Sequence, residues 1–291
     1  MLASELLKKV KKIELKTRRV VDDLLAGQYR SQFKGYGVQF SDHRLYTPGD
    51  DVRHIDWKVS ARSRDPVIKK YEEERELTVM LLVDVSGSQG FGTHRQWKFE
   101  TAAETAGILA YAASRVGDRV GAILFSGGID KIIPPKKGRS HILRVIRDVL
   151  AAEPREGSGT ALSDALESAL HLLKHLGIVF VVSDFESENI DKPLRRLARR
   201  HDVIAVPISD RRESEASPLG TVLFRDPETG REAWVNTDSY AFKTWIKKRG
   251  ERKTESLSAL FKSCGVEAIP LSSEKDAGDA ILSFFRKRRR R

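Results

Sequence analysis

Five short apolar runs, separated by helical patterns, restrict this chain to a small set of folds. The first run, LTVMLLVD (77–84), is apolar along almost its whole length and ends in a carboxylate. A strand buried on both faces of a parallel sheet has this composition. The later runs are RVGAILFS (119–126), IVFVVSD (178–184), DVIAVPI (202–208) and VEAIPL (266–271). Apolar residues at helical spacing lie between them, over 96–116, 141–150, 162–173, 192–200 and 240–264. This alternation predicts an α/β fold, a mostly parallel, doubly wound sheet with helices on both faces.

The sequence also indicates how the chain is divided. We expect residues 1–76 to form an N-terminal extension of a helix, over 4–26, and an irregular segment packed on the core. The α/β domain itself is expected over 77–285, with a hairpin insertion at about 209–238 around the turn DPETG. Residues 286–291, RKRRRR, are interpreted as a basic tail.

Composition excludes several classes of protein. No apolar run approaches the roughly 20 residues that a membrane-spanning helix needs. The N-terminus has no apolar stretch with a small-residue cleavage site, so we expect no secretory signal. Cys264 is the single cysteine, which excludes an intramolecular disulfide framework and favours a cytoplasmic protein. We interpret it as a small core residue.

The net charge of +11 is concentrated at the C-terminus, where the six basic residues of the tail leave only +5 for the rest. Such a tail is typically solvated. The alternative is weak, non-specific contact with anionic lipid headgroups or with nucleic acid.

Three polar segments fall where the predicted strands and helices place them together. DVSGS begins at the end of the first strand, GSGT precedes the helix over 162–173, and SD ends the strand after that helix. In an open parallel sheet, ligands bind beyond the carboxyl ends of the strands, where the strand order reverses. The hydroxyls and carboxylates supply five oxygen ligands, which suit a hard cation such as Mg²⁺ or Mn²⁺. The predicted metal ligands are Asp84, Ser86, Ser88, Thr160 and Asp184.

DVSGS, GSGTALSDAL and VVSDFES together resemble the metal-ion-dependent adhesion site of von Willebrand factor A domains. The resemblance implies that these same five residues coordinate the ion, and all five match. It also implies a Rossmann-like sheet with one short antiparallel edge strand, for which KIIPP (131–135) is the candidate. Proteins of that kind mostly bind ligands through the metal, which implies a partner protein that offers a carboxylate.

A second resemblance covers the segment upstream of the first strand. GVQFSDHRLYTPGDDVRHIDWKVSARSRDPVIKKYEEERE is similar to the signature of family fifty-eight among domains of unknown function. The resemblance implies that this segment accompanies a von Willebrand factor A-like domain. It further implies an AAA+ ATPase of the MoxR type as the partner, with a role in chaperone-like assembly or maturation.

The signature itself mixes acidic and basic residues closely. We interpret it as a salt-bridged clamp, with Tyr46 and Trp57 as candidate anchors to the sheet. The alternative is that Arg53 or Arg62 belongs to a surface that contacts the ATPase. His43 and His54 are interpreted as hydrogen-bonded structural residues, because the sequence has no zinc-like spacing of histidine and cysteine.

Two other functions compete with a binding module. One is a Mg²⁺-dependent phosphohydrolase or nuclease, in which Asp84 would be a nucleophile. Haloacid dehalogenase-like phosphatases, however, have a second acid two residues on, where this chain has Ser86, and the sequence contains no P-loop. The other is non-specific nucleic-acid binding through the basic tail, but no recognition motif for specific binding is present. We therefore expect a binding module without catalytic residues.

Overall fold

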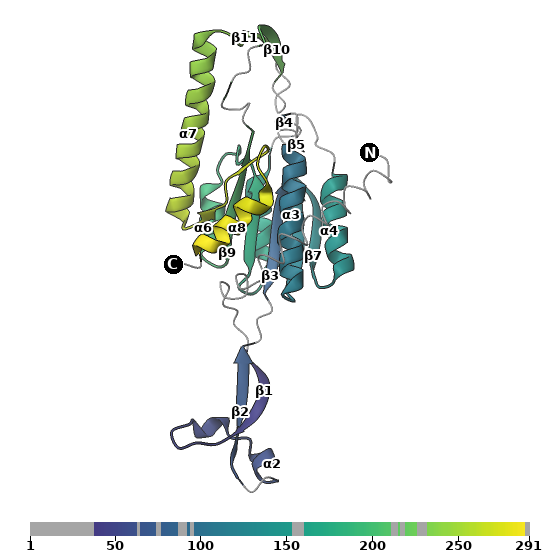
Figure 1. Cartoon of the computed structure of the whole chain (residues 1–291), viewed down its shortest axis with the longest axis vertical. Helices are drawn as coiled ribbons and strands as arrows, with labels where there is room; N and C mark the ends of the chain where they lie inside the picture. Colours follow the sequence, from purple (N-terminus) through teal and green to yellow (C-terminus); the bar gives the residue numbers. More distant parts are fainter. Residues whose placement is uncertain are drawn as a thin grey trace. The chain divides into compact units, whose positions relative to one another are not determined.

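The computed structural model describes residues 38–62, 65–73, 77–86, 92–93, 96–152, 160–210, 215, 219–225 and 232–288. They belong to two compact units, one within Phe33–Glu76 and one that holds the described residues from Leu77 onward. The helix expected over 4–26 lies outside the described residues. Figure 1 shows both units, coloured along the sequence.

The larger unit is built on one mixed sheet with the strand order β12-β9-β8-β3-β6-β7, and β13 also pairs with β9. Every neighbouring pair is parallel except β6 and β7, which are antiparallel. This confirms the predicted α/β fold, and the antiparallel edge strand contains the KIIPP segment. The strands are β3 (Thr78–Asp84), β6 (Arg119–Phe125), β7 (Ile129–Lys136), β8 (Ile178–Ser183), β9 (Asp202–Ser209), β12 (Glu267–Ala268) and β13 (Leu271–Ser272).

Helices cover the two faces of this sheet (Figure 1). One face carries α3 (Lys98–Arg115), α4 (Arg139–Ala151) and α8 (Ala277–Arg288), because α3 contacts both of the other two. The opposite face carries α5 (Leu162–Leu172), α6 (Asp191–Ala198) and α7 (Tyr240–Cys264), which contact one another in that order. Among the described residues, no helix is both long enough and apolar enough to cross a membrane.

Burial on both faces explains the continuous apolar runs of the central strands. Met80 and Leu82 of β3 and Val179 and Val181 of β8 pack in one cluster with α5, α6 and α7. The alternate residues of these strands are buried as well, towards the other face. Burying each such side chain contributes about 1.5–3 kcal/mol, so these strands anchor the fold.

The VEAIPL run differs from the prediction of one strand, because it divides into β12 and β13. Pro270 lies between them and has no N–H for the sheet, which interrupts the ladder of hydrogen bonds.

The basic tail also begins later than expected. α8 continues through Arg286 to Arg288, and Arg288 pairs with Asp202 at 2.8 Å and with Glu267 at 3.1 Å. The first three tail residues therefore belong to a helix, and the last of them is an ion-pairing residue of the fold.

The segment predicted as a hairpin insertion, at about 209–238, contains a two-stranded antiparallel hairpin. Its strands are β10 (Thr221–Arg225) and β11 (Glu232–Asn236). A second, very short hairpin joins β4 (Gly92–Thr93) to β5 (Gln96–Trp97) just before α3. Both hairpins are sheets of their own and do not extend the central sheet.

The smaller unit is a hairpin with two short helical turns between its strands. β1 (Val38–Leu45) pairs antiparallel with β2 (Val67–Glu73), and η1 (Val52–His54) and α2 (Trp57–Ser60) lie in the connection. Asp51 and Asp56 cap the two turns through their carboxylates.

Three ion pairs of the signature lie within this unit. Arg44 forms a two-pronged pair with Asp50, with both N–O distances at 2.7 Å. His43 contacts Asp56 at 3.2 Å, as expected of a hydrogen-bonded structural histidine. Trp57, a candidate anchor, has 69% of its surface exposed.

Candidate metal centre

The candidate site lies where the two central strands end. β3 ends at Asp84, and the neighbouring parallel strand β8 ends at Ser183, one residue before Asp184. The chain leaves β3 for β6 on one side, and later returns to β8 on the other side. The strand order therefore reverses at β3, the position at which open α/β sheets bind ligands.

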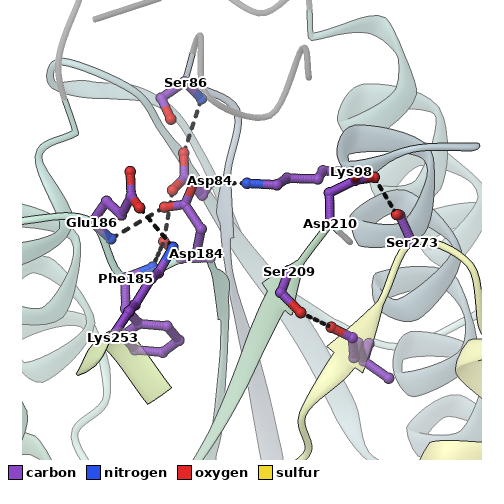
Figure 2. Close-up of polar contacts among 12 residues, drawn as sticks. Asp84, Ser86, Lys98, Asp184, Phe185, Glu186, Ser209, Asp210, Lys253 and Ser273 are labelled. Atoms are coloured by element: carbon purple, nitrogen blue, oxygen red, sulfur yellow. Dashed lines mark hydrogen bonds and ion pairs between the residues drawn. The ribbon is translucent and has the colours of Figure 1, made fainter. Parts of the chain in front are cut away.

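Asp84 is completely buried, and its two oxygens have different partners. Ser183 Oγ donates a hydrogen bond to Asp84 Oδ2 at 2.6 Å, and the Ser86 backbone N–H donates to Oδ1 at 2.9 Å. Figure 2 shows Ser86 and Asp184 on either side of Asp84. The carboxylate is thus oriented by the end of β8 on one side and by the Ser86 N–H on the other.

Asp184 is also buried, and the turn that follows it is held in an unusual conformation. Its Oδ1 accepts a hydrogen bond from the Glu186 N–H at 3.2 Å. Phe185 has a φ of 55°, a left-handed conformation that costs about 1–3 kcal/mol for a non-glycine residue. The buried Phe185 ring packs edge-on against Phe261 of α7, with 5.0 Å between centroids. Packing on α7 therefore stabilises the turn that presents Asp184.

Lys98, at the start of α3, brings a buried positive charge to the site. Its Nζ lies 3.4 Å from Asp184 Oδ2. On the other side of the carboxylates, Glu186 pairs with Lys253 of α7 at 2.8 Å (Figure 2). The site thus combines two buried carboxylates, one buried ammonium and one more exposed ion pair.

Burial and like charge make the ionised form of Asp84 unfavourable. Burial, and secondarily the Asp184 carboxylate, raise the pKa of Asp84 to about 7, although hydrogen bonds from Ser183 and Ser86 oppose the rise. For Lys98, burial lowers the pKa while the Asp184 carboxylate raises it. A divalent cation between the carboxylates would remove the repulsion that raises the pKa of Asp84, so these residues fit a metal ion.

The described residues contain no group of three or more His, Cys, Asp or Glu that could hold a metal ion. A metal at Asp84 and Asp184 would therefore complete its coordination with hydroxyls and water. Such an all-oxygen set suits Mg²⁺ or Mn²⁺.

The structure brings together three of the five predicted ligands, Asp84, Ser86 and Asp184. Thr160 is tied to the same turn through its backbone, because Ser187 Oγ donates to the Thr160 carbonyl at 2.8 Å. Ser88 lies outside the described residues.

Sequence reasoning missed two residues of this site. Ser183 directly precedes Asp184 at a predicted strand end, which indicates that it lies near the site, but its partner Asp84 follows only from the register of β3 and β8. Lys98 carries no such signal, since it lies 86 residues from Asp184 and a lysine at a helix start is usually solvated.

A mostly parallel α/β sheet with one antiparallel edge strand, and with acidic residues at the ends of its central strands, defines a von Willebrand factor A-like protein. The family model described as "Protein of unknown function DUF58" matches residues 42–256. The chain belongs to the DUF58 family.

Relatives of the chain occur in several bacteria. The uncharacterised protein Rv1480 of Mycobacterium tuberculosis is 30% identical over 281 residues, which cover 96% of this chain and 88% of that protein. The uncharacterised protein YeaD of Bacillus subtilis is 34% identical over 110 residues, which cover 38% of this chain and 25% of that protein.

Solved structures that match the chain include the conserved hypothetical protein BatB from Bacteroides thetaiotaomicron. Its TM-score is 0.47 at 18% identity, and the match covers 74% of this chain and 100% of that chain. The SpRpn10 VWA domain has a TM-score of 0.42 at 13% identity, covering 71% of this chain and 94% of that chain.

Proposed function

We propose that this chain is a metal-ion-dependent protein-binding module. Mg²⁺ or Mn²⁺ would be held by Asp84, Ser86, Ser88, Thr160 and Asp184, and a partner protein would offer a carboxylate to the metal. The observation that carries the proposal is the pair of buried carboxylates, Asp84 and Asp184, side by side at the reversal of strand order. Two buried like charges are costly unless a cation compensates them.

Binding is favoured over catalysis by the chemistry of the residues around these carboxylates. When bound, the metal supplies an electrophilic centre that attracts an anionic ligand. Asp84 and Asp184 would hold the ion, while Ser183 and Ser86 fix the orientation of Asp84. Haloacid dehalogenase-like phosphatases have a second acid two residues after the nucleophile, and the position two residues after Asp84 is occupied by a serine.

The partner that we propose is a cytoplasmic AAA+ ATPase of the MoxR type, with the chain as its adaptor in assembly or maturation. The smaller unit offers a surface for such a contact. Leu45, Val52 and Trp57 are 57–69% exposed there, beside charges that already pair within the unit. Exposed large apolar side chains are common at protein-binding surfaces.

Calorimetric titration of Mg²⁺ and Mn²⁺ into the metal-free protein tests the metal site. We expect saturable binding to the wild type, and its loss in Asp84→Asn and in Asp184→Asn. Asp148→Asn is the matched control, because Asp148 is a buried, ion-paired carboxylate of α4 outside this site. Absence of metal binding in the wild type would remove the proposal.

Capture of a partner protein tests the proposed interaction with an AAA+ ATPase. Protein captured from a native lysate with and without chelator is compared for wild type, Asp84→Asn and Trp57→Ser. We expect an AAA+ ATPase with the wild type in metal, and its loss in both variants. Retention of the ATPase by Trp57→Ser would exclude this surface, and retention by the wild type in chelator would exclude metal dependence.

A further inference from the structure

Lys98 is a residue whose burial calls for an explanation. Lysine is almost never fully buried unless its ammonium group is paired, because desolvating that charge costs several kcal/mol. Here the side chain is 2% exposed and the paired Asp184 side chain is 0% exposed. The ammonium therefore lies in the same buried surroundings as Asp184, a predicted metal ligand, where charges act on one another strongly.

A divalent ion would bind beside a positive charge that is already in place. Among the described residues, Asp84 and Asp184 contribute two negative charges when both are ionised, and Lys98 contributes one positive charge beside Asp184. Glu186 lies on the other side of the carboxylates (Figure 2) and pairs with two cations, Lys253 at 2.8 Å and Arg249 at 3.8 Å. A bound Mg²⁺ would bring two more positive charges close to the Lys98 ammonium, and an anionic ligand would offset that repulsion.

We propose that Lys98 is a specificity-determining residue, a built-in positive charge that weakens the binding of the metal alone and makes the metal-loaded site require an acidic ligand. This inference rests on the proposed metal-dependent binding function. It names the chemistry of the ligand, a carboxylate from a glutamate or aspartate of a protein. It also states a regulation, since metal and acidic ligand each raise the affinity of the site for the other. Such coupling is reciprocal by thermodynamic necessity.

A purely structural role for Lys98 predicts a different change in metal affinity when its ammonium group is removed. If the ammonium served only to compensate the buried Asp184 carboxylate, its removal would disturb the site and weaken metal binding. If it repels the metal, its removal strengthens metal binding. The two roles are therefore separated by the sign of one change.

The experiment measures Mg²⁺ affinity by calorimetry for the wild type, Lys98→Gln and Lys98→Met. We expect each variant to bind Mg²⁺ about tenfold more tightly or better, given the strength of charge interactions in a desolvated site. Lys131→Gln is the matched control, since Lys131 also pairs with a buried carboxylate, Asp148 at 2.9 Å, on β7 and α4. Its Mg²⁺ affinity should equal that of the wild type.

A second measurement uses the unmodified protein and a capped tripeptide with a central glutamate, against the same peptide with glutamine. We expect the glutamate peptide to raise the Mg²⁺ affinity of the wild type, and the glutamine peptide to leave it unchanged. In Lys98→Gln the advantage of the glutamate peptide should fall. The wild-type measurement tests whether metal and acidic ligand are coupled, and the comparison with Lys98→Gln tests whether Lys98 contributes to that coupling.

Each outcome has a separate meaning. Wild-type binding of Mg²⁺ with equal or weaker binding by folded Lys98 variants would overturn the inference and leave the proposed function intact. Equal Mg²⁺ affinity of the wild type with the two peptides would overturn the inference and the proposed carboxylate ligand, and would leave metal binding itself intact. Absence of Mg²⁺ binding by the wild type and the variants alike would remove the proposed function, and this inference with it.

Discussion

Asp84→Asn should stabilise the metal-free protein at neutral pH, although it removes a predicted metal ligand. Burial and the neighbouring Asp184 raise the pKa of Asp84 from its ordinary value of 3.8 to about 7. The native state thus holds this proton more tightly than the unfolded chain does. Stability is consequently lost as the pH rises from about 4 to about 7, and the full penalty applies above that range.

The size of this stabilisation follows from the shift in the pKa of Asp84. At about 1.4 kcal/mol for each pH unit, ionisation of Asp84 destabilises the metal-free native state by up to about 4 kcal/mol. Asparagine has no charge and keeps an oxygen that can accept from the Ser86 N–H. Rearrangement of the hydrogen bond with Ser183 costs about 0.5–1.5 kcal/mol. A net gain of about 2–4 kcal/mol at pH 8 is therefore expected.

Urea unfolding in chelator, at pH 5 and at pH 8, measures this difference. The wild type should lose stability between the two pH values, and Asp84→Asn should lose much less. Addition of Mg²⁺ at pH 8 should restore the wild type, by about 2.7 kcal/mol at a hundredfold excess over the dissociation constant, and leave the variant unchanged. Identical pH dependence of the two proteins in chelator would refute the electrostatic reasoning.

Three further predictions concern the scaffold. Gly177→Ala should lower the free energy of unfolding by about 1–3 kcal/mol, because a Cβ there would lie 2.7 Å from the Thr78 carbonyl oxygen, and urea unfolding measures it. Phe261→Ala should cost about 3 kcal/mol or more and weaken Mg²⁺ binding in calorimetry, since its ring supports Phe185 beside Asp184. Arg288→Ala should cost about 1 kcal/mol in low salt and less in 1 M NaCl, because its two ion pairs are partly exposed, and thermal melts at both salt concentrations measure it.

Each of these three variants has its own control or its own contradicting result. Gly128→Ala meets nothing within 4 Å and should leave the urea midpoint unchanged, so an equal loss in both alanine variants would contradict the steric explanation. Unchanged Mg²⁺ affinity in Phe261→Ala would mean that the turn keeps its shape without the ring. A loss in Arg288→Ala that is independent of salt would indicate packing of the side chain as its source.

The sequence by itself determined the elements and the strand ends. A strand buried on both faces must be apolar along its length, so β3 and β8 are visible as runs, and the carboxylates that end them are visible too. The helix predicted over 240–264 agrees with α7 because its boundaries are chemically marked. Ser239 caps its first turn, and Gly265 follows its last turn with a φ of 70°.

Other features were decided only by the tertiary structure. The pairing of Ser183 with Asp84 follows from β8 lying beside β3, and the approach of Lys98 to Asp184 joins α3 to the end of a strand 86 residues later. In the same way, the first part of the predicted basic tail belongs to the end of α8, where Arg288 forms ion pairs with carboxylates on β9 and β12.

The physical reason is the same in each case. The spacing of apolar residues indicates whether a segment is buried, and on how many faces, so helices, strands and their ends can be predicted from the nearby sequence. This spacing does not indicate which segments lie side by side in the fold. A charged side chain such as Lys98 is read as solvated until the fold places a carboxylate beside it, and only then does its burial become favourable.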